Sequence, residues 1–233
     1  MSAAPVALER AARFYGSTLG KKTVMAITGA ILFGFTFVHM AGNMQFYLGP
    51  DVLNAYGAQL REMPAVLWGM RAVLLIAVVA HIVAAVQLWS TNREARPVGY
   101  QKLTPASSSL ASRTMLYSGP MQAAFIAYHL YHFTLGPHLM HDPVTGVPMA
   151  YENVVAGFED PLAVILYLTA MAFLGLHLYH GVWSMFQSVG WSHPKYTPRL
   201  RLFALVSTIL IVLGNISIPL AVITGIYRNL PGH

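Results

Sequence analysis

Five long apolar segments alternate with short polar stretches along the chain. Each segment exceeds the ~20 residues that a helix needs to cross the hydrocarbon core of a bilayer. Backbone groups in lipid must find partners within the segment, which favours helices over open strands. The pattern therefore predicts an all-α integral membrane bundle of five transmembrane helices. The predicted spans are Thr23–Leu48, Val66–Ser90, Thr114–Pro137, Pro161–Val189 and Leu202–Ile226.

Composition supports a membrane protein and excludes several kinds of site. Hydrophobic residues make up 56% of the 233 residues and charged residues only 9%, with a mean hydropathy of +0.54. Soluble domains carry about 25% charged residues, so lipid is the solvent that this surface suits. The chain has no cysteine. Disulfides, cysteine-attached haem and cysteine-ligated iron–sulfur clusters are therefore excluded from it.

The basic residues predict the orientation in the membrane. Eleven of the fourteen lie in the N-terminal segment, the second loop or the fourth loop, whereas the third loop, 138–160, has none and carries four acidic residues. The positive-inside rule then places the N-terminus in the cytoplasm. This topology accounts for the net charge of +6, so the charge does not require a nucleic-acid partner. We expect a cytoplasmic segment 1–22, a transmembrane domain 23–226 and an external tail 227–233. Residues 1–22 lack the apolar core of a signal peptide and could form an amphipathic surface helix.

Histidines inside the predicted spans are the candidate chemistry, because an ionisable residue in lipid is costly and points to function. At ~1.5 Å per residue, His39 and His129 lie ~25 Å from the cytoplasmic face, and His81 and His177 lie ~18–20 Å from it. Two levels with two histidines each predict two stacked b haems, each with iron held by two imidazoles. His39 and His129 would bind the outer iron, and His81 and His177 the inner iron.

Other histidines leave alternatives open. His132 and His180 each follow a predicted ligand by three residues, so each could compete for the role or bond to a propionate or carbonyl. A transmembrane histidine can also serve helix packing alone. The histidines outside the spans are expected to be solvated: His138, His141, His193 and His233.

Three stretches resemble one known family. The first runs S-T-L-G-K-K-T-V-M-A-I-T-G from Ser17 and continues with V-H-M-A-G-N at Val38–Asn43. The second is S-R-T-M-L-Y-S-G with A-Y-H-L-Y-H-F, and the third is L-H-L-Y-H-G-V-W-S-M-F-Q-S-V-G-W at Leu176–Trp191. In order and spacing they resemble the succinate dehydrogenase/fumarate reductase cytochrome b subunit, b558 family, over about residues 17–215.

The resemblance implies a function. It implies a five-helix anchor in the inner (cytoplasmic) membrane with two b haems, on the same four ligands, within respiratory complex II of the tricarboxylic acid cycle. A flavoprotein subunit with FAD and an iron–sulfur subunit would dock on the cytoplasmic face. Electrons would pass through the haems to or from a quinone, with menaquinone expected, and a higher oligomer is compatible with this. The chain by itself would not act on succinate. One departure is Gly175, where some dihaem relatives have a glutamate in a transmembrane proton path.

Two other functions fit part of the pattern. The cytochrome b subunit of a hydrogenase or formate dehydrogenase also holds two haems in a small bundle. A haem-free transporter using intramembrane histidines would instead show no visible absorbance.

Overall fold

A computed structural model describes residues 3–95 and 109–229, and these residues form helices without any strand. The predicted all-α class is confirmed for this part of the chain. The elements in chain order are α1 (Ala3–Gly16), α2 (Thr18–Asn43), η1 (Met44–Leu48), α3 (Pro50–Arg61), α4 (Pro64–Glu94), α5 (Leu110–Arg113), α6 (Met115–Leu130), η2 (Tyr131–Leu135), α7 (Ala150–Phe158), α8 (Pro161–Ser188), α9 (Thr197–Ile223) and η3 (Ile226–Asn229).

Four helices are long and apolar enough to cross a membrane: Thr18–Leu48 (α2 with η1), α4, α8 and α9. Their outer faces expose large apolar side chains to the surroundings, for example Leu75 at 64%, Ile76 at 68% and Leu213 at 56%. Contiguous apolar surface of this kind requires a non-aqueous environment. The chain is therefore a multi-pass membrane protein.

The third predicted span, Thr114–Pro137, is not one uninterrupted α-helix. Its α-helical part, α6, has 16 residues, and the 5 residues of η2 continue it with π-type bonding. The amide of Gly136 donates to the carbonyl of Tyr131, and Pro137 follows. At ~1.5 Å per residue α6 alone spans about 24 Å, which is short of the bilayer core. The count of five spans therefore remains a prediction.

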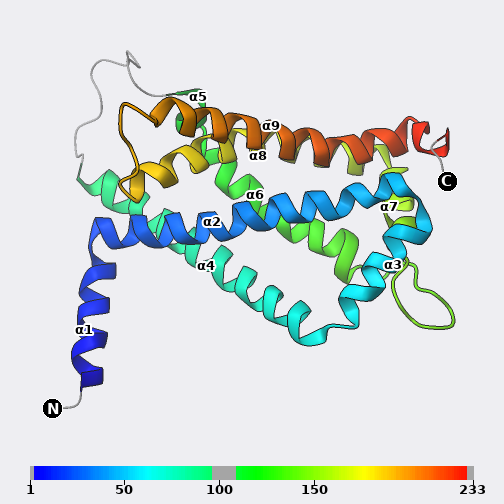
Figure 1. The fold of residues 1–233 in the computed structure, drawn as a ribbon, viewed down its shortest axis with the longest axis horizontal. Coiled ribbons are helices and arrows are strands. Elements are labelled where there is room, and N and C mark those ends of the chain that lie inside the picture. The colour runs from blue at the N-terminus through cyan, green and yellow to red at the C-terminus, as the bar shows by residue number, and fades with distance from the viewer. Residues whose placement is uncertain (1–2, 96–108, 230–233) are drawn as a thin grey trace.

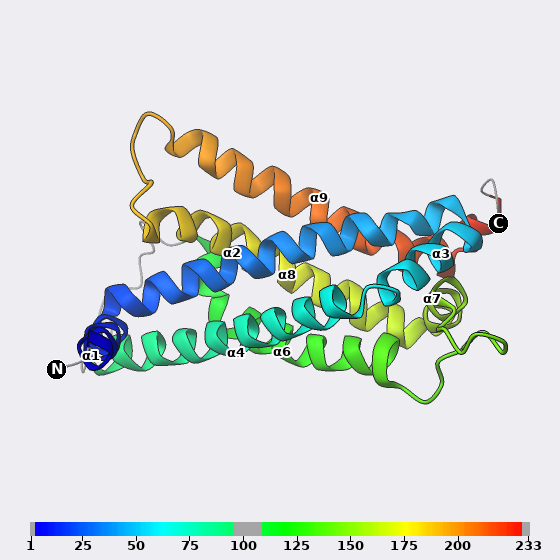
Figure 2. The same ribbon diagram turned by 60° about the horizontal axis from the view of Figure 1, so that its bottom comes forward.

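The long helices run between two ends of the bundle (Figures 1 and 2). We call them the α1 end, where α1, α5 and the α8–α9 connection lie, and the α7 end, where α3, α7 and η3 lie. Helix α6 runs from the α1 end to the α7 end alongside α8 (Figure 1). Helix α2 packs on both α4 and α8, so these helices enclose the middle of the bundle.

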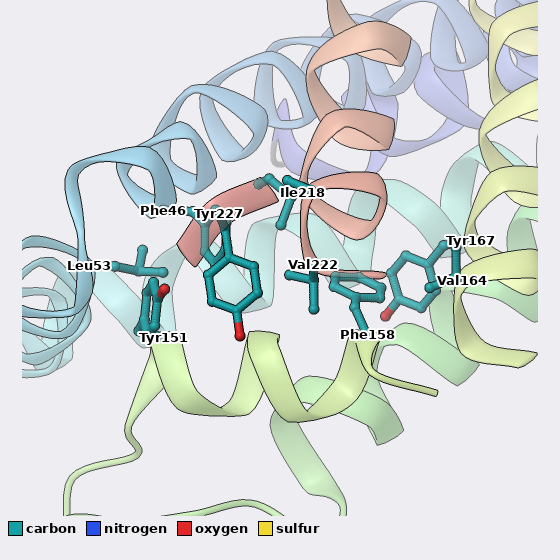
Figure 3. Close-up of a cluster of buried hydrophobic side chains, with 10 residues drawn as sticks. Phe46, Leu53, Tyr151, Phe158, Val164, Tyr167, Ile218, Val222 and Tyr227 are labelled. Carbon is teal, nitrogen blue, oxygen red and sulfur yellow. The ribbon is translucent and has the colours of Figure 1, made fainter. Parts of the chain in front are cut away.

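The α7 end contains two short helices that the sequence pattern missed. Helices α3 and α7 fall within stretches predicted to be loops. Asn54 on α3 joins them, because its amide donates to Glu152 and its carbonyl oxygen accepts from the amide of Tyr151. A buried aromatic and aliphatic cluster includes Leu53 and Tyr151, which come from these two helices (Figure 3). The cluster holds α7 and η3 against the ends of α8 and α9.

The N-terminal segment forms helix α1, as predicted, and α1 turns sharply away from α2 (Figure 1). A Cβ added to Gly20 would overlap the carbonyl oxygen of Phe14, so glycine is needed at this corner. The Tyr15 hydroxyl donates to Gln87 on α4 over 2.8 Å and ties the corner to the bundle. Helix α2 begins at Thr18, five residues before the predicted start of the first span.

The ends of the molecule differ in charge as the sequence indicates. Glu152, Glu159 and Asp160 belong to α7 or to its junction with α8, and Arg228 pairs with Glu159 over 3.5 Å. Lys195 and Arg199 lie between α8 and α9 or in the first turn of α9, at the opposite end. Arg96 and Lys102, two of the basic residues counted in the second loop, and His233 lie outside the described residues.

Candidate functional site

The four histidines predicted to bind iron lie in two pairs across the bundle. His39 on α2 faces His129 on α6, with ring centroids 5.7 Å apart and ring planes inclined by 80°. His81 on α4 faces His177 on α8, with centroids 6.3 Å apart and planes inclined by 60°. We call them the α7-end pair and the α1-end pair. The structure thus brings together the same partners that the sequence argument paired.

Three helices independently give the separation of the two pairs. On α2, Thr28 contacts His81 and lies eleven residues before His39. On α6, Ser118 contacts His177 and lies eleven residues before His129. These steps correspond to ~16 Å along a helix, and the ten residues from Tyr167 to His177 on α8 give ~15 Å. The predicted depths of ~25 Å and ~18–20 Å imply a smaller separation, so counting residues from the predicted helix ends places the two levels too close together.

His81 is oriented by a hydroxyl on the neighbouring helix. Its Nδ1 lies 3.1 Å from Oγ1 of Thr28, and that hydroxyl donates its own proton to the carbonyl of Val24 over 2.7 Å. The Thr28 oxygen therefore accepts from Nδ1–H of His81, which leaves Nε2 of His81 without a proton. An unprotonated imidazole nitrogen is the form that binds a metal.

His177 is oriented in the same way from α6. Its Nδ1 lies 3.3 Å from Oγ of Ser118, and Ser118 is completely buried. When Nδ1–H donates to this oxygen, Nε2 of His177 is again the free nitrogen. Both members of the α1-end pair are thus held by a small hydroxyl residue on another helix, and a metal-ligating histidine likewise donates its second N–H to a fixed acceptor.

His129 contacts a buried tyrosine. Its Nδ1 lies 3.0 Å from the hydroxyl of Tyr167 on α8, and the same hydroxyl lies 3.1 Å from Nδ1 of His132. Tyr167 belongs to the cluster shown in Figure 3, beside Phe158 and Val164. His132 is itself buried, and it lies in the π-type turn η2.

His39 is held differently from the other three. Phe35 stacks on its ring, with centroids 5.3 Å apart, and its Nε2 lies 3.4 Å from Nδ2 of Asn43 on the next turn. Metal binding through Nε2 therefore requires the Asn43 amide to move away or the His39 ring to turn. Asn43 is the last residue of the V-H-M-A-G-N stretch.

The geometry of both pairs suits a metal between two imidazoles. With roughly 2 Å from metal to nitrogen and roughly 1.1 Å from nitrogen to ring centroid, opposed rings would lie about 6 Å apart. The observed separations of 5.7 and 6.3 Å bracket this value. Among the described residues no group of three or more His, Asp or Glu side chains gathers as a metal site. Two ligands per level suit a metal whose other positions a porphyrin fills.

A glycine on α2 lies against the α1-end pair. A Cβ built on Gly29 would lie 3.4 Å from Cε1 of His81, so a larger side chain there would meet the ring. The absence of a side chain at Gly29 therefore lets α2 lie close to the ring of His81.

The remaining candidates have other surroundings. His180 is half-buried one turn beyond His177, and His138, His141 and His193 are exposed, as expected. Nε2 of His138 lies 3.0 Å from the carbonyl of His132. Arg71, the one arginine inside a predicted span, lies over the ring of Trp68 at 4.8 Å from its centroid. This cation–π contact gives Arg71 a partner within its own helix.

Sequence reasoning did not select the residues that hold the histidines: Thr28, Ser118, Tyr167 and Asn43. Each is polar and lies in or at the end of an apolar span, which is the signal that could have indicated them. No known family model matches the chain, and neither a curated protein nor a solved structure matches it.

Proposed function

We propose that this chain is the membrane-anchor cytochrome b subunit of a succinate:quinone oxidoreductase. Its task is to carry electrons through two b haems between an iron–sulfur subunit and a quinone, for which we propose menaquinone. We also propose five spans in the cell's inner membrane, with the N-terminus in the cytoplasm.

The paired histidines carry this proposal. Each of the four comes from a different helix, and they meet as two pairs about 15–16 Å apart along the helix axes. Helix packing alone accounts for single intramembrane histidines, which bond to a neighbouring helix. It gives no reason for imidazole rings to meet in pairs, with centroids about 6 Å apart, at two levels.

Each residue of the two pairs has a stated role. His81 and His177 would bind one iron, with Thr28 and Ser118 fixing the nitrogen that each presents. His39 and His129 would bind the other iron. The haem supplies one-electron chemistry when it is bound, and the protein orients its ligands and excludes water. The chain has no cysteine to ligate an iron–sulfur cluster. We assign the iron–sulfur clusters, and FAD with them, to partner subunits.

Charge supports the side on which those partners dock. The α1 end carries the basic residues around the α8–α9 connection and the start of α2, including Lys21, Lys22 and Arg201. Such a surface is typical of a cytoplasmic face, and it attracts an acidic partner. The iron–sulfur subunit would then sit nearest to the α1-end pair.

A reduced-minus-oxidised visible spectrum of the purified complex tests the proposal, with haem quantified per chain and co-purifying subunits identified. We expect about two non-covalent b haems per chain. Absence of haem would reject the proposal in favour of a transporter. Hydrogenase or formate dehydrogenase subunits in place of a flavoprotein with succinate activity would reject the assignment to complex II.

A further inference from the structure

Tyr167 occupies an unusual position, because its single hydroxyl lies between two histidines of the same motif. It is 3.0 Å from Nδ1 of His129 and 3.1 Å from Nδ1 of His132. Tyr167 is 6% exposed and His132 is 8% exposed, so water does not satisfy these groups. The three side chains must satisfy one another.

Counting protons leaves two arrangements. A tyrosine hydroxyl donates one hydrogen bond and accepts others, and a neutral imidazole carries a proton on one nitrogen. In the first arrangement Nδ1–H of His129 donates to the Tyr167 oxygen, and the Tyr167 proton goes to Nδ1 of His132. Nε2 is then free on His129 and protonated on His132. In the second arrangement the two histidines exchange these roles, so that Nε2 is protonated on His129 and free on His132.

Given that one of the two rings binds a metal, their surroundings favour His129 for this role and hence the first arrangement. The ring of His129 faces His39 across the bundle. Nε2 of His132 instead points at α7, where a Cβ added to Gly157 would lie 2.8 Å from it. Backbone of α7 therefore covers the nitrogen that His132 would need for a metal. His132 also packs against Phe158 of the same helix, with ring centroids 6.1 Å apart.

We propose that Tyr167 is a positioning residue that makes His129, and not His132, the ligand at the α7-end pair. Its oxygen holds Nδ1–H of His129, and its proton fixes His132 as a hydrogen-bond acceptor. This inference rests on the proposed function and assigns the two histidines of the His129–His132 motif. The π-type turn η2 begins between them, at Tyr131.

The test replaces Tyr167 with phenylalanine in the intact complex and titrates the two haems separately. An acceptor at the second nitrogen makes a ligating imidazole more basic and stabilises oxidised iron. Tyr167→Phe should therefore raise the midpoint potential of the α7-end haem and weaken its binding by roughly 10–100-fold. The α1-end haem should keep its potential. Haem transfer to an apo-globin measures the affinity without any use of succinate.

Tyr128→Phe is the matched control. The Tyr128 ring stacks on His132, with centroids 5.4 Å apart, and also packs against Tyr167. The Tyr128→Phe variant removes a hydroxyl from the same cluster and leaves the contacts of the Tyr167 hydroxyl with His129 and His132 in place. We expect both potentials to stay at their wild-type values in this variant.

Two outcomes separate this inference from the proposed function. A wild-type complex without haem overturns the function itself, whereas two haems with Tyr167→Phe indistinguishable from wild type overturn only the role of Tyr167. Should Tyr167→Phe fail to assemble, His132→Asn and His129→Asn decide. We expect His132→Asn to keep both haems and His129→Asn to lose the α7-end haem, and the reverse result refutes the assignment.

Discussion

Oγ1 of Thr28 on α2 lies 3.1 Å from Nδ1 of His81 on α4, so one transmembrane helix fixes the imidazole of another. Thr28→Val keeps the size of the side chain and removes the acceptor. A buried Nδ1–H without a partner costs ~1–3 kcal/mol. We expect binding of the α1-end haem to weaken by roughly 10–100-fold. Haem retention during transfer to an apo-globin measures this.

Thr28→Ser is the matched control, because the serine hydroxyl can bond to the same carbonyl and the same nitrogen. It should retain the α1-end haem at the wild-type level. Equal losses in Thr28→Val and Thr28→Ser would show that the methyl group, and not the hydroxyl, supports the site.

The α7-end pair should be separable from the α1-end pair by mutation. His39→Ala removes one of two opposed imidazoles, and the other pair lies about 15–16 Å away along the helices. We expect haem content to fall from about two to about one per chain, with the α1-end haem unchanged in its spectrum and potential. Haem quantification and redox titration check this. Loss of both haems with equal ease would contradict the pairing.

Gly29 offers a steric test of the α1-end pair. A Cβ there would already lie 3.4 Å from Cε1 of His81, so the branched side chain of Gly29→Val would displace the ring. We expect selective loss of the α1-end haem. Gly34→Val on the same helix is the control, since no heavy atom lies within 4 Å of a Cβ built there. It should retain both haems, and both variants carry the same cost in helix propensity.

The sequence predicts most of the bundle because lipid imposes one simple requirement. Apolar stretches such as Pro161–Val189 must be helical, and the observed α8 ends within one residue of that range. Helices α3 and α7 do not cross the bilayer, so no long apolar run marks them. Their positions depend on tertiary contacts such as the bond from Asn54 to Glu152, which local patterning does not encode.

The depth of each histidine along its helix predicts how the histidines pair, but it does not predict their hydrogen-bond partners. Depth predicts His81 opposite His177 because both helices end at the basic face. Whether Thr28 or another hydroxyl meets Nδ1 depends on helix rotation and interhelical distance. The change from α-helical to π-type bonding at Tyr131 could not be predicted either, since π-type bonding leaves no clear signal in the sequence.

The turn after Asp142 should respond to pH. Its carboxylate accepts from the amide of Thr145 at 2.7 Å, the Thr145 hydroxyl at 2.9 Å and the amide of Val144 at 3.0 Å. These bonds, the Thr145 amide first, hold the pKa of Asp142 below its ordinary value. A lowered folded-state pKa means that the stabilisation is complete above the ordinary pKa of about 3.9 and is lost as pH falls through the lowered value.

Amide hydrogen exchange measures this loss. The protection of the Thr145 amide should be constant from neutral pH down to about 4 and should fall below that. Asp142→Asn keeps an accepting oxygen that does not titrate, so its protection should not change over the same range. A similar fall in Asp142→Asn would assign the effect to another group.

Span number and orientation can be decided together because the chain has no cysteine, so an introduced cysteine is the only thiol in it. Single cysteines replace Glu9 on α1, Val144 in the loop before α7 and Lys195 between α8 and α9. All three positions are exposed, and Val144 is 90% exposed. A membrane-impermeant maleimide is applied to intact cells and then to permeabilised cells, with the cysteine-free parent as the control for background.

Five spans with a cytoplasmic N-terminus predict labelling of intact cells only at position 144. If α6 and η2 did not cross, the four remaining spans would keep position 9 inside, move position 144 inside and place position 195 outside. An external N-terminus would reverse all three results in either case. We expect the first pattern, because α6 and η2 lead toward the acidic α7 end and the basic residues gather at the α1 end.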